Sequence, residues 1–351
     1  MNSFQEKVLF RFAQKSMGAP FVFTPEEYRK GNSVREPADL VWACNNCIFL
    51  FYLTSRENNK EAIDSVIEGR VQKMIKHNIS QAKGWLQEWR DGKPIIGMNK
   101  YNSFEIYYDD YKYKIVLSIV DYSNSEGSYH NDYCDILGVD LCATISQKSF
   151  QYLTQVNASA LDFILLINDL KKYSQINSYP GFMSLGRDYF DQSRQYAFRS
   201  MKKSLLGMLP DDKMLISVTQ TFNLLRESQA DSFAENRDSA ITLSSILNDI
   251  TLKEYYVLSF LLAQQLTQHY KDVRQYVVYF HPFDRYLVVV GIANSSNIEL
   301  IGVPMLELAN KIEKDNPEHS VITLLYETSL PNIVMGFRPI NGKSQCELAI
   351  E

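Results

Sequence analysis

Several features that would place this chain in a specialised class are missing. Cysteine is scarce and odd in number, with five residues in 351, which excludes the dense, even framework of a small secreted disulfide protein. The most apolar stretches, such as 48–53 and 257–263, fall far short of the roughly 20 residues that cross a bilayer. Residues 1–14 mix charges with apolar positions, unlike a signal peptide. A reducing cytoplasm is the expected compartment.

Excess positive charge and the common nucleotide motifs are also missing. The net charge of -5 excludes a chain that coats nucleic acid by charge alone, although a local basic patch stays open. No G-x-x-x-x-G-K-[ST], G-x-G-x-x-G or H-E-x-x-H sequence occurs, which removes the usual nucleotide-binding and zinc-protease classes.

What is present indicates a folded α/β protein in more than one part. The chain is 45% hydrophobic and 22% charged, which are globular values, and 351 residues exceed the usual size of one core. The composition shifts to Ser, Asn, Gly and Pro at 173–186, which predicts a boundary near residue 175. We therefore expect an α/β domain at 1–175, a helical connecting region at 176–270 and a small ββαββ module at 271–351.

Periodicity and turn residues predict the elements of each part. Apolar spacing predicts an amphipathic helix that opens the chain and ends at Gly18 and Pro20. Two strands are expected to meet at Asn45 and Asn46, residues that tolerate positive φ in a tight turn. The expected strands are 40–41, 48–53, 104–108, 113–120, 141–146, 273–280, 286–292, 321–326 and 333–337, and the main helices are 4–12, 61–90, 149–156, 159–172 and 304–314.

The order of motifs in the first half carries a resemblance. A starting helix holds Glu6, the run 35–39 (Arg-Glu-Pro-Ala-Asp) introduces an apolar strand, a second strand follows a short turn, and a long helix contains Gln81. In this order, residues 1 to about 172 resemble the PD-(D/E)xK nuclease superfamily, which includes restriction-like and Mrr-like endonucleases. The resemblance implies a restriction-endonuclease-like mixed sheet flanked by helices.

The resemblance also implies where a nuclease site would lie. In that family an Asp at the position of Asp39, and a Glu two residues before a Lys on the next strand, hold Mg²⁺ and position a water. Here the Glu and Lys positions are Tyr52 and Thr54, which replace neither a carboxylate nor an ammonium. No catalytic residue is therefore expected, with Glu36, Asp39 and Gln81 as remnant candidates.

Two readings of these residues stay open. The missing groups could have moved to Glu57 and Lys60 beyond the strand, or to lysines on the following helix, namely Lys73, Lys76 and Lys83. Glu36 could also serve as the second carboxylate. Alternatively, Asp39 caps a turn and accepts backbone hydrogen bonds. Gln81 would then be a solvated side chain and Glu6 a surface charge.

A basic helical stretch supplies the candidate nucleic-acid contacts. It carries Arg187, Arg194, Arg199, Lys202 and Lys203. Aromatic residues lie between these charges, so basic groups could meet phosphates while rings stack on bases. The alternative is a solvated face over an aromatic core.

Two further constellations carry weaker hypotheses. Cys44 and Cys47 form a C-x-x-C, and Cys134 and Cys142 could add two thiolates to a zinc site, although buried thiols fit the spacing better. His281 lies three residues before an Asp in an expected hairpin turn, without a nucleophile elbow.

The functional expectation is a nuclease-fold protein without catalysis that binds nucleic acid or a protein partner. The resemblance implies a prokaryotic DNA-processing or antiviral defence setting. One alternative is an active nuclease with relocated residues, the only case that requires Mg²⁺ as cofactor. The other is a protein-interaction scaffold, with a homo-oligomer among the candidates. No membrane partner is expected.

Overall fold

The computed structural model describes most of the chain: residues 4–56, 64–122, 133–174, 182–202, 216, 219, 237–269, 276–280, 286–293, 298–317, 320–327, 332–337 and 345–350. The fold divides into two compact units. The first comprises Met1–Tyr189 together with Ser344–Glu351, and the second comprises Phe190–Lys343. Residues 344–351, which the sequence analysis includes in the module at 271–351, thus belong to the first unit.

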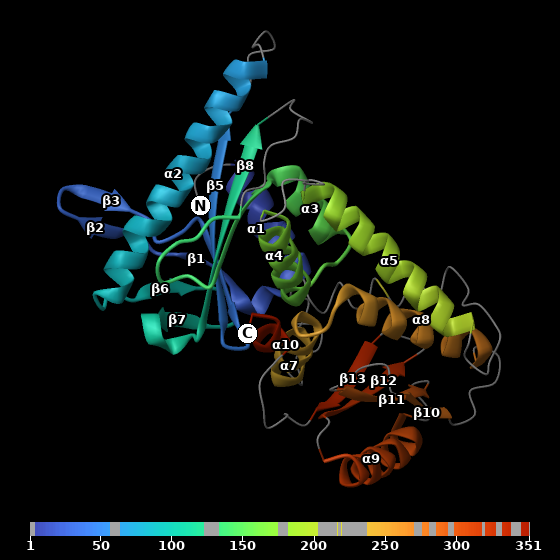
Figure 1. Ribbon diagram of the computed structural model, residues 1–351. Coiled ribbons are helices and arrows are strands. Elements are labelled where there is room, and N and C mark those ends of the chain that lie inside the picture. Colours follow the sequence, from blue (N-terminus) through green and yellow to red (C-terminus); the bar gives the residue numbers. More distant parts are fainter. Residues whose placement is uncertain are drawn as a thin grey trace. The chain divides into compact units, whose positions relative to one another are not determined.

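A seven-stranded mixed sheet forms the first unit (Figure 1). Its order is β7–β6–β1–β4–β5–β8–β9. The strands are β1 (Val22–Pro25), β4 (Leu40–Cys44), β5 (Cys47–Arg56), β6 (Ile95–Met98), β7 (Ser103–Ile106), β8 (Tyr113–Tyr122) and β9 (Leu141–Ser146). β5 pairs with β8 and β8 with β9 in parallel, and the other neighbours are antiparallel. The expected α/β class, with a large mixed sheet flanked by helices, is confirmed.

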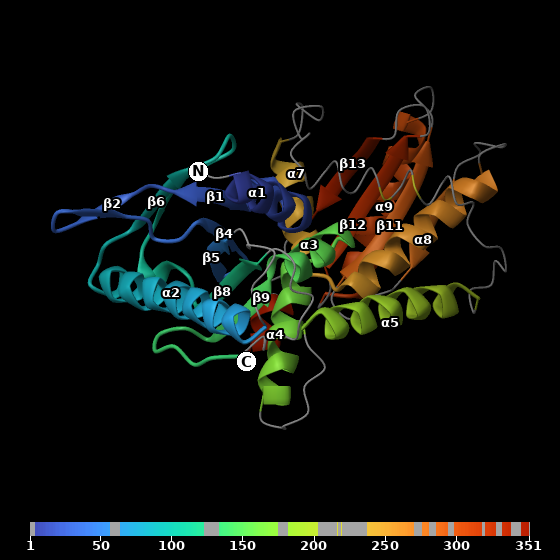
Figure 2. The same cartoon turned by 90° about the horizontal axis from the view of Figure 1, so that it is seen from above.

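Helices cover both faces of this sheet. They are α1 (Phe4–Met17), α2 (Asp64–Arg90), α3 (Gln147–Gln155), α4 (Ala160–Ser174) and α10 (Gln345–Ile350). α2 lies along β5 and β8 on one face, while α1, α3 and α4 lie on the other (Figures 1 and 2). Between β5 and β8 the chain passes through α2 and then through β6 and β7, a long connection of the kind that a parallel pair requires.

Side-chain alternation in β5 explains the two layers. Its residues from Cys47 to Tyr52 are buried, because helices cover both faces. Leu50 and Tyr52 belong to the core cluster under α2, together with Trp85. Phe51 faces the other way, where its ring lies 5.9 Å from that of Phe150 in α3. Each aromatic ring that is removed from water in this way contributes roughly 1.5–3 kcal/mol.

The turn between β4 and β5 follows the prediction. Asn45 and Asn46 have φ values of 52° and 59°, so both occupy the left-handed region that asparagine tolerates. The Asn46 side chain donates from Nδ2 to Oε1 of Glu347 in α10 at 3.2 Å. α10 also packs against α4, where Asn168 Nδ2 donates to the Ala349 carbonyl oxygen at 2.5 Å.

Several elements of the first unit lie outside the prediction. β1 and β6 pair in the middle of the sheet although each has only four residues. A separate two-stranded hairpin, β2 (Tyr28–Lys30) with β3 (Ser33–Arg35), turns at Gly31, whose φ is 61°. Tyr28 anchors this hairpin against α2, with its ring 4.7 Å from that of Trp85.

The second unit contains a four-stranded sheet of order β10–β11–β12–β13. Its elements are β10 (Tyr276–Phe280), β11 (Tyr286–Ala293), α9 (Ile298–Asp315), β12 (Ser320–Glu327) and β13 (Asn332–Phe337). β11 and β12 are hydrogen-bonded neighbours in parallel, and α9 lies between them in the sequence. Val289, Met305 and Val321 form part of the core between α9 and the sheet. The expected strand and helix order is confirmed within the described residues, but a helix start at Pro304 is wrong because α9 begins at Ile298.

Three helices of the middle region complete the description: α5 (Phe182–Lys202), α7 (Arg237–Asn248) and α8 (Leu252–His269). Residues 182–202 and 237–269 are mainly helical, as expected for this region. Across the described residues, no helix combines the length and the apolar character needed to span a membrane.

Candidate functional site

Asp39 lies just before β4 and is tied to β5. Its backbone N–H donates to the Phe51 carbonyl oxygen at 2.9 Å. Its carboxylate Oδ2 accepts the backbone N–H of Leu53 at 2.5 Å. The backbone N–H of Asp39 therefore extends the β4–β5 ladder by one residue, and the Asp39 side chain accepts a backbone hydrogen bond.

The surroundings of Asp39 raise the pKa of its carboxyl group. Burial raises the pKa of Asp39 to about 7, and the negative charges of Glu36 and Glu6 raise it further, while the Leu53 N–H lowers it. The pKa of Glu36 is also raised, first by burial and then by Glu6. These three carboxyl groups are close enough to influence one another across space.

Tyr52 and Thr54 of β5 both form hydrogen bonds within the protein. The β4–β5 register, extended by one residue, places Asp39 opposite Tyr52 on the sheet face that α2 covers. The Tyr52 hydroxyl donates to the Pro37 carbonyl oxygen at 2.7 Å. Burial, then the Asp39 charge, keeps the pKa of Tyr52 well above its usual range. Tyr52 is thus a neutral donor and not a metal ligand.

Asn78 of α2 completes this face, and the sequence analysis did not identify it. Its Oδ1 accepts a hydrogen bond from the Thr54 hydroxyl. Its Nδ2 donates to the Tyr52 carbonyl oxygen at 3.1 Å and to Ser118 Oγ at 3.0 Å. A further contact reaches the Ile119 carbonyl oxygen at 3.3 Å. The one available signal was an amide at an apolar position of the helix, four residues after Met74.

The remaining candidates of the nuclease-like set do not join Asp39. Gln81 is exposed on α2, next to the buried Ala82. Lys73, Lys76 and Lys83 are also exposed on this helix. Glu57 and Lys60 lie outside the described residues. The buried face that contains Asp39 therefore gathers Tyr52, Thr54 and Asn78. Of the replacements proposed among the described residues, Glu36 lies within electrostatic reach of Asp39, and the lysines of α2 are exposed.

The charges of α5 are only partly described. Arg187, Arg194 and Arg199 are exposed, whereas Lys203 and the side chain of Lys202 lie outside the described part of the chain. Arg187 lies over the ring of Tyr152, 5.9 Å from its centre. The exposed carboxylates of Asp188 and Asp191 lie among these cations.

Among the described aromatic side chains of α5, Tyr189 and Phe190 pack within the protein. The Tyr189 hydroxyl donates to Asp162 Oδ1 at 2.7 Å. The rings of Phe190 and Tyr256 pack edge to face with centres 5.8 Å apart. Tyr196 is the exposed exception, and Lys253 Nζ lies 3.8 Å from its ring centre. Among these described rings, Tyr196 is therefore the one exposed for stacking on a base.

The cysteines form separate pairs. Cys44 and Cys47 are buried opposite each other in the β4–β5 hairpin. Cys134 and Cys142 face each other with Sγ atoms 3.0 Å apart, and the hydrogen bond between them, followed by burial, raises the pKa of Cys142. No group of three or more His, Cys, Asp or Glu suited to a metal forms among the described residues, which contradicts the four-thiol zinc hypothesis. His281 and Asp284 lie outside those residues.

Comparison with known proteins adds no family: no family model, no curated protein and no solved structure matches the chain.

Proposed function

We propose that this chain is a nuclease-fold protein that does not hydrolyse phosphodiester bonds and that acts by binding nucleic acid. The observation that carries the proposal is the chemistry around Asp39. The two positions that would supply a second carboxylate and an ammonium hold Tyr52 and Thr54, and both hydroxyls donate to the protein's own acceptors.

The order of elements supports the nuclease-like part of the proposal. A helix with Glu6 comes first, and β1 and the β2–β3 hairpin follow it. Strand β4 then comes after Asp39, strand β5 after a tight turn, and the long helix α2 with Gln81 after that. This agrees with the order on which the resemblance rests. Asp39 also lies beside Tyr52 of the neighbouring strand, where the resemblance expects the metal-binding groups to meet.

The chemistry of Mg²⁺ argues against hydrolysis at this face. Mg²⁺ requires hard oxygen ligands, and a carboxylate binds it only when deprotonated. With its pKa raised to about 7, Asp39 is protonated in a large share of molecules near neutral pH. A single carboxylate in this state holds a hydrated Mg²⁺ poorly.

The binding part of the proposal rests on exposed cations. Arg187, Arg194 and Arg199 of α5 are exposed and available for phosphate contacts. The five cysteines are free thiols, which suits the reducing cytoplasm that the proposal implies. A prokaryotic DNA-processing or antiviral defence system is the proposed setting, and it comes from the resemblance alone.

An active Mg²⁺-dependent nuclease is the second candidate, favoured by one observation. Glu6 and Glu36 each raise the pKa of Asp39, so three carboxyl groups lie within electrostatic reach of one another. A divalent cation near Asp39 would relieve this repulsion, although the three groups do not form a metal site among the described residues.

The test is binding and cleavage of labelled single- and double-stranded DNA and RNA in Mg²⁺, Mn²⁺ and EDTA. Wild type is compared with Asp39→Asn, which keeps an acceptor for the Leu53 N–H, and with the control Asp91→Asn at an exposed carboxylate. We expect binding that is independent of the metal, and no cleavage by any of the three proteins.

Cleavage, or an absence of binding, would each indicate a function other than the one proposed. Metal-dependent cleavage that disappears in Asp39→Asn and persists in Asp91→Asn would establish the nuclease. An absence of binding to every nucleic acid would favour the protein-interaction scaffold, and the molar mass in solution would then show whether the partner is a second copy of the chain.

A further inference from the structure

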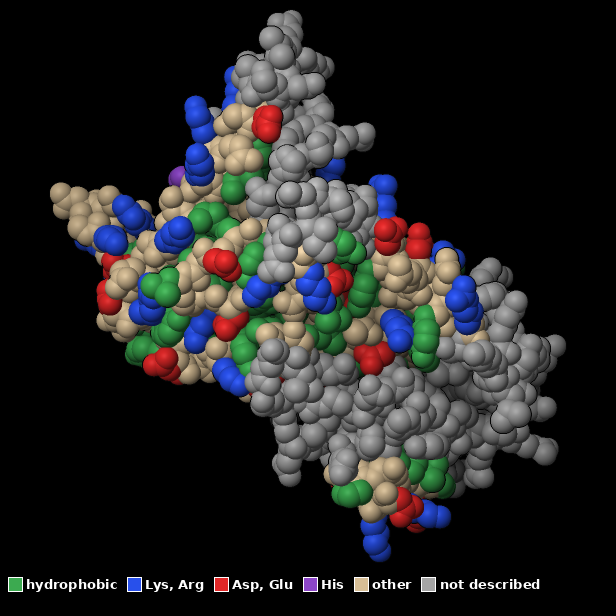
Figure 3. All heavy atoms as spheres, viewed as in Figure 1, with side chains coloured by type: hydrophobic (Ala, Val, Ile, Leu, Met, Phe, Trp, Pro, Cys, Tyr) green, Lys and Arg blue, Asp and Glu red, His purple; other side chains and the backbone are tan. Residues whose placement is uncertain are grey.

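The outer side of α2 carries an unbroken row of exposed residues. They recur at steps of three or four, which places them on one side of a helix: Lys73, Lys76, Ser80, Lys83, Gln87 and Arg90. At a rise of 1.5 Å per residue this row extends over roughly 25 Å. His77 is exposed beside it. In Figure 3, lysine and arginine side chains recur along α2.

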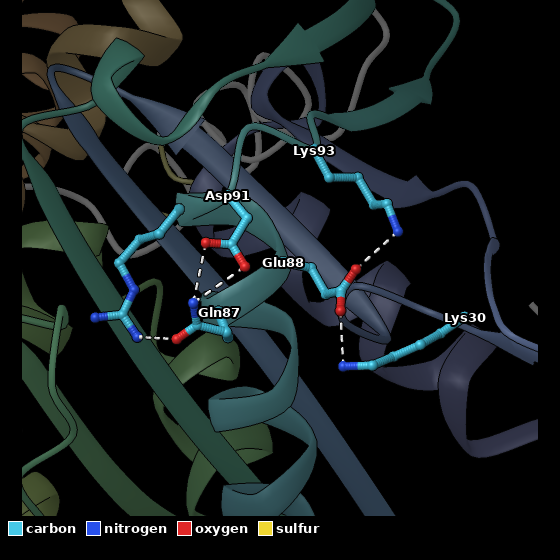
Figure 4. Close-up of polar contacts among 6 residues, drawn as sticks. Lys30, Gln87, Glu88, Asp91 and Lys93 are labelled. Carbon is cyan, nitrogen blue, oxygen red and sulfur yellow. Dashed lines mark hydrogen bonds and ion pairs between the residues drawn. The ribbon is translucent and has the colours of Figure 1, made fainter.

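This row is called the α2 basic row, and near its C-terminal end Gln87 donates to the exposed carboxylate of Asp91 at 3.0 Å (Figure 4). Within the part of the chain that the structure describes, no ion pair forms to Lys73, Lys76 or Lys83. The acidic residue of α2 nearest to the row in sequence is Glu88, which Lys30 and Lys93 hold at 2.7 and 2.9 Å (Figure 4).

The absence of pairing distinguishes the row from an ordinary solvated helix face. Such faces gain stability from Glu or Asp three or four residues from each Lys. Here His77 and Lys76 follow Lys73 at those distances, and Ser80 and Gln87 flank Lys83. Like charges at this spacing destabilise a helix, and a bound polyanion would reverse the effect.

Further exposed cations lie beside the C-terminal part of α2, on the β2–β3 hairpin. The β2–β3 hairpin lies against the helix through Tyr28, and its register places Arg35 opposite Tyr28. Arg29, Lys30 and Arg35 are all exposed. Lys30 and Lys93 both form ion pairs with Glu88, so the negative charge of this carboxylate is already balanced by two lysines (Figure 4).

The chemistry of the row favours nucleic acid over an anionic membrane. A helix that lies in a membrane interface places large apolar side chains beside its cations. On α2 the large apolar residues Met74, Trp85 and Trp89 are buried against the sheet, and the row itself contains Lys, Arg, Ser and Gln. Such groups suit a phosphodiester backbone, to which Lys and Arg donate and which Ser and Gln also contact.

We propose that the α2 basic row, extended by the β2–β3 hairpin, is the surface on which this protein binds the phosphate backbone of nucleic acid. The inference rests on the proposed nucleic-acid binding and assigns it to α2 of the first unit, separately from the cations of α5. Because contacts to phosphates do not read bases, the binding is independent of sequence and decreases with salt.

The experiment measures affinity for labelled duplex DNA and single-stranded RNA at several salt concentrations. The test variant is Lys73→Gln/Lys76→Gln/Lys83→Gln. The control variant is Lys172→Gln/Lys311→Gln/Lys314→Gln, which removes the same charge from exposed lysines of α4 and α9. Circular dichroism and thermal unfolding show that both variants keep the fold.

We expect the test variant to lose about tenfold or more in affinity, and its salt slope on duplex DNA to decrease by about 2 to 3, since each lost phosphate contact removes about 0.9. The control variant should match wild type. An unchanged test variant, or an equal loss in the control, would overturn the assignment to α2 while leaving the proposed function intact.

Two further arms separate the remaining possibilities. If wild type binds no nucleic acid, the proposed function fails, and this assignment fails with it. Vesicles containing phosphatidylserine provide the membrane comparison. Retention of wild type on these vesicles, lost in the test variant while nucleic-acid affinity is unchanged, would assign the row to a lipid surface instead.

Discussion

Asn78 is the residue whose loss should damage the buried face most. It is fully buried, and it joins α2 to β5 and β8 through Thr54, the Tyr52 carbonyl oxygen and Ser118. Asn78→Ala should lower the free energy of unfolding by about 2–3 kcal/mol, because several buried polar groups lose their partner. Urea denaturation measures this loss.

Ser80→Ala, at an exposed position of the same helix, is the control for Asn78→Ala. It should change the free energy of unfolding by less than about 0.5 kcal/mol. An Asn78→Ala variant as stable as this control would show that the network contributes little.

Asp39 should make stability depend on pH. Its folded pKa of about 7 lies above the ordinary value of 3.8, so the folded protein binds this proton more tightly than the unfolded chain. The resulting stability is complete below about pH 4 and is lost as pH rises through 7. Asp39→Asn should remove this loss, which is on the order of a few kcal/mol. Urea denaturation of both proteins between pH 4 and 8 measures it.

Glu88 provides a comparison of opposite sign. Lys30 and Lys93 lower its pKa from 4.5 to about 2 by donating hydrogen bonds. Its contribution is therefore present above pH 4.5 and is lost as pH falls towards 2. Glu88→Gln should remove a decline at acid pH, whereas Asp39→Asn removes one near neutral pH. Parallel profiles for the two variants would contradict both assignments.

At the scale of elements, Gly97 decides how closely β6 approaches β1. A Cβ atom there would lie 2.5 Å from the Phe23 ring, which stacks on Phe104 at 4.0 Å. Gly97→Ala should lower the free energy of unfolding by about 1–3 kcal/mol because this ring has to move. Thermal unfolding measures the effect.

Gly84→Ala is the matched control. It lies inside α2, and a Cβ atom there meets nothing within 4 Å. This change should stabilise the protein by about 0.5–1 kcal/mol, since alanine has the higher helix propensity. Equal effects of the two substitutions would show that the β1–β6 approach is not constrained by Phe23.

Elements with a strong local pattern were predictable, and those without one were not. β9 has the expected bounds, and the β4–β5 turn forms at Asn45 and Asn46. β1 and β6 have four residues each, too few for a clear alternation, and they become strands by pairing with each other. Pro304 resembled a helix start but lies within α9, where packing of Met305 and Ala309 outweighs the local signal.

At the scale of the molecule, the end of the chain belongs to the first unit. Cys346 and Glu347 of α10 are buried, and α10 bonds to Asn46 and Asn168. A chain ending at residue 343 should unfold at a temperature lower by about 5–10 °C, since both contacts and the burial are lost. Differential scanning calorimetry measures the shift.

A chain ending at residue 350 keeps α10 and serves as the control for this truncation. Its unfolding temperature should equal that of the full chain. If removal of 344–351 left the first unit equally stable, the return of the chain through α10 would be of no consequence for its folding.

In the candidate site, residues close in sequence were predictable, whereas contacts between separate elements were not. Asp39, Tyr52 and Thr54 were recognised from a motif whose spacing is local. The sequence did not show that Asp39 accepts the Leu53 N–H or that Asn78 binds Thr54, because those contacts join separate elements. The lysines of α2 were likewise visible, but their common exposure on one side emerged only from the way the helix packs.

The amino-acid sequence by itself determined the α/β class, the long helices and strands, and the tight turn at Asn45 and Asn46. These follow from apolar periodicity, turn residues and motif spacing, which act between neighbouring residues. The tertiary structure decided the strand order, the return of α10 to the first unit and the raised pKa of Asp39. Each of these depends on burial and pairing between residues far apart in the chain, which only the folded backbone brings together.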